Sequence, residues 1–103
     1  RCPIAADDLA RQLWEIAALP RERRAGVWNL VGPEAVSRYA LGVLTAHAAG
    51  LDASGITPAR SAASPVPRPR DVRLLTPRAD RELESRARPI SELLVPASRN
   101  RRA

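Results

Sequence analysis

The sequence predicts an α/β fold in which a helix–strand–helix unit is followed by a loop-rich extension with short helices. Three observations support this prediction: an amphipathic pattern beginning at Ala6, an apolar run over Val27–Val31, and a second helical pattern after Ser37. Helix, strand and helix in this order are typical of layered α/β domains. The chain has 103 residues, which is enough for one small domain.

The first helix is predicted to begin at Ala6 or Asp7 and to end at Pro20. Its apolar residues have the spacing of one helix face, and we expect them to be buried: Leu9, Leu13, Ile16 and Ala17. Its polar residues are expected on the solvent side: Asp8, Arg11, Gln12 and Glu15. The charged segment 21–26 that follows predicts a turn.

The run Val27–Val31 is apolar on both faces except at Asn29, which is typical of a strand inside a sheet. Gly32 and Pro33 end it. Ile56–Ala59 is interpreted as a short second strand.

Ser37 is a predicted N-cap for the second helix, because its hydroxyl can accept a hydrogen bond from the first turn. Leu41, Leu44 and Ala48 lie on one side of this helix. Gly50 is expected to close it in a left-handed conformation.

The extension begins with 61–75, an extended loop rich in proline and arginine. Prolines at 65, 67 and 69 exclude a helix there. Thr76 and Pro77 predict the cap and first position of a short helix that continues through Leu83. A further helical turn is expected at Ser91–Leu94. The basic segment 96–103 is expected to be a disordered tail.

Composition excludes several classes of site. All 17 cationic side chains are arginine, so no mechanism that needs a lysine can run on this chain alone. One cysteine, Cys2, and one histidine, His47, cannot supply a structural zinc site or a disulfide. Without a long apolar stretch, we expect no membrane span and a cytoplasmic location. The sequence contains no methionine, so we expect a processed chain or a piece of a longer one.

Few side chains are candidates for chemistry. His47 and Asp52 accompany no serine in a nucleophile elbow, so His47 is interpreted as a half-buried structural residue. Tyr39 could donate a proton only with a lysine four residues later, where Val43 stands, and it is therefore expected in the core. Cys2 has no partner and is expected to be inert.

The net charge of +6 comes from the second half, where residues 60–103 hold eleven arginines and five acids. This bias keeps open a small basic protein that binds nucleic acid or an acidic partner. However, no aromatic residue follows Tyr39, so that half has no ring on which bases could stack. Nucleic acid is therefore the less favoured partner.

Four segments together resemble a known family: Ala6–Leu13, Gly26–Glu34, Ser37–Tyr39 and Arg68–Leu74. Their order and spacing are similar to the C-terminal part of extended short-chain dehydrogenase/reductases of the dTDP-4-dehydrorhamnose reductase type, the sugar nucleotide-binding proteins. The similarity covers nearly the whole chain, about residues 4–95, and residues 1–95 are interpreted as one segment. It implies a substrate-binding segment that works with an N-terminal cofactor domain.

The resemblance implies an NAD(P)-dependent reductase or epimerase acting on a nucleotide sugar, with NADPH or NADH held by the cofactor domain. This chain lacks that domain's glycine-rich phosphate loop and the Tyr-x-x-x-Lys pair. We therefore expect no catalytic, cofactor-binding or metal residue here, and no reductase activity of the chain alone. The diphosphate of the substrate is assigned first to Arg68, then to Arg73, with Arg70 in support.

Overall fold

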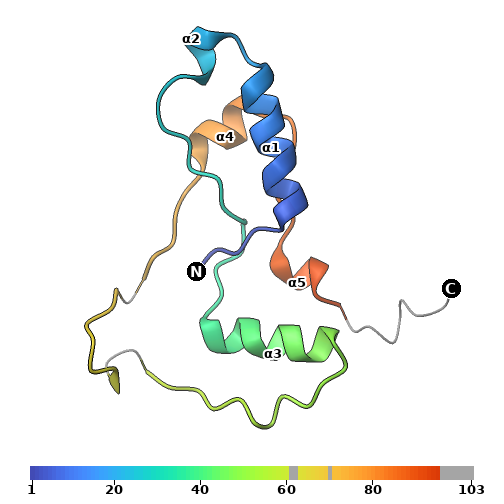
Figure 1. Ribbon diagram of the computed structural model, residues 1–103, viewed down its shortest axis with the longest axis vertical. Helices are drawn as coiled ribbons and strands as arrows, with labels where there is room; N and C mark the ends of the chain where they lie inside the picture. Colours follow the sequence, from blue (N-terminus) through green and yellow to red (C-terminus); the bar gives the residue numbers. More distant parts are fainter. Residues whose placement is uncertain (61–62, 70, 96–103) are drawn as a thin grey trace, which may run out of the picture.

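The computed structural model describes residues 1–60, 63–69 and 71–95, which form helices joined by irregular segments (Figure 1). In chain order the helices of these residues are α1 (Ala6–Ala18), α2 (Arg21–Arg24), α3 (Arg38–Ala48), α4 (Pro77–Glu82) and α5 (Ile90–Leu93). The same residues contain no β-strand, so the predicted α/β fold class is wrong. The predicted tail over 96–103 lies outside the described residues.

Neither predicted strand forms. The apolar run Val27–Val31 has no partner segment in register: its first carbonyl accepts a hydrogen bond from the Arg78 side chain at 3.0 Å. Just beyond the run, the Gly32 N–H donates to the Cys2 carbonyl at 3.2 Å, an isolated contact and no ladder. Ile56–Ala59 is also irregular. A strand needs a paired neighbour, and an apolar run in the sequence cannot supply one.

Helix α1 confirms the predicted first helix, but the face that it buries is not the predicted one. Asp8 and Gln12, expected in solvent, are only 2% and 5% exposed, whereas Leu13 is 52% exposed. The rest of the predicted buried stripe is half-buried or exposed: Leu9, Ile16 and Ala17. The polar face of α1 therefore takes the tertiary contact.

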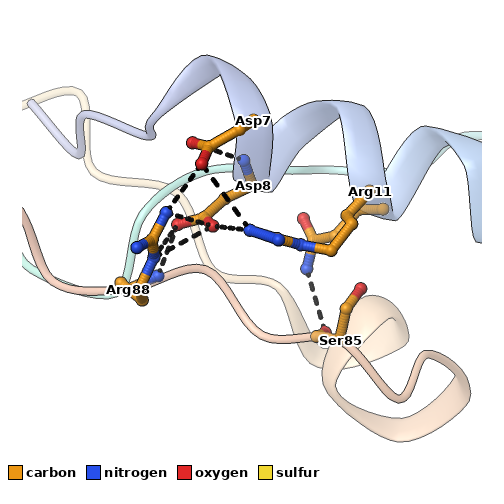
Figure 2. A network of polar contacts seen from close by, with 6 residues as sticks. Asp7, Asp8, Arg11, Ser85 and Arg88 are labelled. Carbon is orange, nitrogen blue, oxygen red and sulfur yellow. Dashed lines mark hydrogen bonds and ion pairs between the residues drawn. The ribbon is translucent and has the colours of Figure 1, made fainter.

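The residues 84–88, called here the C-terminal segment, lie against this polar face (Figure 2). The Asp8 carboxylate accepts the Arg88 N–H at 2.9 Å, the Arg88 Nε at 3.1 Å and the Arg11 Nη2 at 2.6 Å. Asp7 accepts the Arg88 Nη2 at 3.0 Å. These hydrogen bonds, those of Arg88 above all, hold the pKa of Asp8 well below its usual range.

One and two turns further along α1, the same face continues the contact. The Gln12 Nε2 donates to the Ser85 carbonyl at 3.3 Å. Glu15 accepts the N–H of Ser85 at 2.7 Å and that of Glu84 at 2.9 Å, and these two residues lower the pKa of Glu15. The polar face is buried because the irregular C-terminal segment needs acceptors for its backbone N–H groups.

Helix α3 begins and ends where the sequence predicts. The Ser37 Oγ accepts the Ala40 N–H at 3.0 Å, which is the predicted N-cap. After the helix, Gly50 has φ 72°, the predicted left-handed conformation. Ala46 is the buried residue of α3, and its predicted inward side is half-buried: Leu41, Leu44 and Ala48.

The two C-terminal helices lie close to their predicted positions. Helix α4 has Pro77 at its first position and ends at Glu82, one residue before the predicted end. Helix α5 is one residue ahead of the predicted turn. It is anchored by Glu34, whose carboxylate accepts the Ser91 N–H at 2.9 Å and the Ser91 hydroxyl at 3.0 Å.

The molecule is a thin, open layer. Its dimensions are 50 × 46 × 16 Å, and its Cα radius of gyration is 16.9 Å, against about 13 Å for a compact chain of this length. Helices α1, α2 and α4 gather at one end, and α3 lies at the other (Figure 1). Among the described residues, the buried hydrophobic side chains are Ala46, Ala79 and Leu83.

The loop 61–75 is described in part. Its described portion is not extended throughout, because residues 63–66 bend and the Val66 N–H donates to the Ser64 hydroxyl at 3.2 Å. Across the ranges that the structure describes, every helix is too short or too polar to cross a membrane.

Candidate functional site

A hollow of about 620 Å³ lies between the start of α3 and three short stretches, 59–60, 68–69 and 71–73. We call it the arginine hollow after the five described arginines that line it: Arg1, Arg38, Arg60, Arg68 and Arg73. Asp71 is the acidic residue among its described lining, and Tyr39 is the aromatic one. Five arginines and a single acidic residue in the described lining give this hollow a net positive charge, which suits an anion.

Two of the three predicted diphosphate residues meet in this hollow. Arg68 and Arg73 both line it, and both side chains are exposed to solvent. Arg70 lies outside the described residues.

Arg73 is held in place by Asp71. The Arg73 Nε lies 3.0 Å from both carboxylate oxygens of Asp71, and the Nη2 lies 2.5 Å from Oδ2. The Arg73 N–H also donates to Oδ1 at 3.0 Å. The side-chain and backbone hydrogen bonds from Arg73 lower the pKa of Asp71 to about 2, so this carboxylate is ionised at neutral pH. Asp71 therefore orients Arg73 but also offsets part of its charge.

Other contacts hold the α3 side of the hollow. The Ser37 cap fixes the first turn of α3, which carries Arg38 and Tyr39. The Arg1 backbone nitrogen donates to the Val36 carbonyl at 2.9 Å, and the Val36 N–H donates to the Arg1 carbonyl at 2.8 Å. This reciprocal pair keeps Arg1 beside the start of α3.

A second hollow of about 580 Å³ adjoins the first, because Ala35 and Arg73 line both. Its lining combines apolar residues, among them Val31, Leu74 and Leu75, with the charged residues Arg73, Asp80 and Arg86. Arg73 thus lies at the junction between the two hollows.

The remaining candidates from the sequence lie elsewhere or differ from expectation. His47 is exposed, not half-buried. Tyr39 was expected in the core, yet it is 44% exposed and lines the arginine hollow, so that prediction is wrong. Cys2 is half-buried and lines the second hollow. Within the described ranges, no group of three or more His, Cys, Asp or Glu side chains could hold a metal ion.

Sequence reasoning missed Arg1, Arg38, Arg60 and Tyr39 as parts of this site. No local signal joins them, because they come from three separate stretches of the chain. The one usable hint is the pair Arg38–Tyr39 directly after a capping serine, which places a cation and a ring on the first turn of a helix.

Comparisons with family models, with curated proteins and with solved structures found no match for this chain.

Proposed function

We propose that this chain is the substrate-binding segment of an NAD(P)-dependent sugar-nucleotide reductase or epimerase, and that the arginine hollow holds the diphosphate of the nucleotide sugar. The observation that carries the proposal is the meeting of Arg68 and Arg73 in one hollow with three further arginines. The sequence resemblance had assigned the diphosphate to these two residues.

The chemistry of the hollow suits a diphosphate. A guanidinium presents a planar fork of N–H donors, which matches pairs of phosphate oxygens better than an ammonium does. The volume of about 620 Å³ lies within the usual range for small-molecule sites. Because Arg68 and Arg73 are exposed, each contact would compete with water, and binding depends on several arginines acting together.

In this proposal the chain binds the nucleotide sugar and takes no part in cofactor binding or hydride transfer. The sequence contains no glycine-rich loop for a dinucleotide, and without any lysine it contains no Tyr-x-x-x-Lys pair. The residues of this chain therefore do not fit a nicotinamide cofactor, and no step of hydride transfer is assigned to them.

The test is calorimetric titration of the full chain with thymidine diphosphate, using Arg68→Ala, Arg68→Lys and a control, Arg21→Ala. Arg21 is an exposed arginine of α2 that does not line the hollow. Loss of a charge-assisted contact should weaken binding by roughly tenfold to a hundredfold in Arg68→Ala. Arg68→Lys should recover part of this loss, and Arg21→Ala should bind like the wild type.

Two results would contradict the proposal. If Arg68→Ala binds as tightly as Arg21→Ala, Arg68 is a surface residue. If the wild type fails to bind thymidine diphosphate but binds generic DNA with an affinity that falls steeply with salt, the chain is a basic nucleic-acid-binding protein instead.

A further inference from the structure

We propose that Tyr39 is the nucleobase-binding residue of the arginine hollow, and that its ring stacks on the base of the nucleotide whose diphosphate the arginines hold. This inference rests on the proposed function and adds to it the residue that recognises the nucleoside end of the ligand.

Tyr39 is the aromatic side chain available for this contact. The chain has three aromatic residues, Trp14, Trp28 and Tyr39, and Tyr39 alone of these lines the hollow. The Trp28 ring is covered by the Arg78 guanidinium, 3.8 Å from its centroid, and its Nε1 donates to the Arg24 carbonyl. Trp14 lies on α1, away from the hollow, and is 80% exposed.

The position of Tyr39 is fixed before a ligand arrives. It is the second residue of α3, and the hydrogen bond from Ala40 to the Ser37 cap holds that turn. A tyrosine has two side-chain torsions to order, so immobilising the ring on binding costs little entropy. The residue is 44% exposed and lines the hollow, which leaves it accessible to a planar group of a ligand.

The residues that line the hollow with Tyr39 are of two kinds, apolar and cationic. Val36, Pro69 and Val72 supply apolar lining suited to the flat faces of a base. Arg38 and Arg68 supply charge suited to phosphate. A nucleoside diphosphate carries both kinds of group joined in one molecule, whereas pyrophosphate carries the charge without the ring.

The experiment compares three probes on the full chain by calorimetry: thymidine diphosphate, pyrophosphate and glucose 1-phosphate. Base stacking on an aromatic side chain should make thymidine diphosphate bind roughly 5- to 150-fold more tightly than pyrophosphate. Tyr39→Leu should abolish that difference and leave pyrophosphate binding unchanged, while Tyr39→Phe and Tyr39→Trp should keep it. Trp14→Leu is the matched control, since it removes an exposed aromatic residue outside the hollow.

The outcomes separate the two proposals. If the wild type binds none of the three probes, the proposed function fails and this inference falls with it. If pyrophosphate and thymidine diphosphate bind equally to the wild type, the hollow is an anion site and the role of Tyr39 is overturned. If Tyr39→Leu weakens glucose 1-phosphate as much as thymidine diphosphate, the ring contacts the sugar and not the base. If Tyr39→Leu fails to fold, the difference in affinity between thymidine diphosphate and pyrophosphate on the wild type still tests whether the hollow binds a base.

Discussion

Arg78 joins α4 to the loop that follows α2, and its removal is the sharpest test of how this open layer is held together. The Arg78 Nη1 donates to the Val27 carbonyl at 3.0 Å, and the Nη2 donates to the carbonyls of Arg23 and Ala25 at 2.9 Å and 2.8 Å. The guanidinium also lies 3.8 Å from the centroid of the Trp28 ring. Substituting Arg78 by alanine removes all of these contacts at once.

The size of the effect follows from these contacts. The Arg78 side chain is 27% exposed, so water competes for its three hydrogen bonds to carbonyls. Each of these bonds therefore contributes about 0.5 kcal/mol to stability, near the lower end of the usual range. Stacking of a partly solvated guanidinium on a tryptophan adds about 0.5–1 kcal/mol. We therefore expect Arg78→Ala to lower the free energy of unfolding by about 2–2.5 kcal/mol.

The measurement is urea unfolding followed by tryptophan fluorescence in a Trp14→Phe background, so that the emission reports Trp28. Arg81→Ala is the matched control, because Arg81 belongs to the same helix but its side chain is 70% exposed and its ion pair with Glu82 spans 3.8 Å. That change should cost less than about 0.5 kcal/mol. Arg78→Lys should lie between the two, since an ammonium has no planar fork for converging carbonyls.

A cycle with Trp28→Leu isolates the stacking interaction between Arg78 and Trp28. Because Trp28→Leu removes the reporter tryptophan, unfolding of all four variants of the cycle is followed by the helical circular dichroism signal instead. We expect a coupling energy of about 0.5–1 kcal/mol between these two positions. Equal stabilities of Arg78→Ala and Arg81→Ala would refute the reasoning, because the three carbonyl contacts would then contribute nothing.

The other predictions concern acid stability and close backbone packing. The contribution of Asp8 is present above the pKa of an unfolded aspartate, about 4, and is lost as pH falls through the lower pKa of the folded state. Asp8→Asn should therefore flatten the fall in urea midpoint between about pH 5 and about pH 2, while Asp7→Asn, at a side chain 67% exposed, should leave it steep. A Cβ on Gly32 would lie 1.8 Å from the Pro3 carbonyl oxygen, so Gly32→Ala should destabilise the chain by about 1–3 kcal/mol or more in the same assay. Gly55→Ala should leave the stability nearly unchanged, because a Cβ there meets nothing within 4 Å. If both substitutions lower the stability equally, the close approach of Pro3 to Gly32 is not what limits the side chain at that position.

Predictions that rested on short stretches of sequence agree with the structure. The serine cap at Ser37, the left-handed Gly50 and the proline at the first position of α4 each need information from within about one helical turn. The bounds of α1 follow in the same way from its spacing and from Pro20. These features depend on hydrogen bonds and torsions between near neighbours, and a linear pattern records them.

Predictions that needed a distant partner failed or could not be made. Val27–Val31 has the composition of a strand, but no segment pairs with it, so the run stays irregular. The polar face of α1 is buried because its carboxylates serve the backbone of residues 84–88, about seventy to eighty positions away. An amphipathic pattern ranks side chains by hydrophobicity. It does not reveal that the backbone N–H groups of a distant segment will need acceptors on the polar face of the helix.

The sequence alone therefore determined α1, α3, α4 and α5 to within a residue or so, the serine cap of α3, and the arginine-rich, lysine-free character of the chain. It predicted a turn over 21–26, where the structure has the short helix α2. It also singled out Arg68 and Arg73 as candidates for an anion. Only the tertiary structure decided which face of α1 is buried, that no strand forms in the described residues, and that Arg38 and Tyr39 lie across a hollow from Arg68. The reason is physical: helix signals lie within a turn of the chain, whereas burial and a shared hollow depend on how segments far apart in sequence meet.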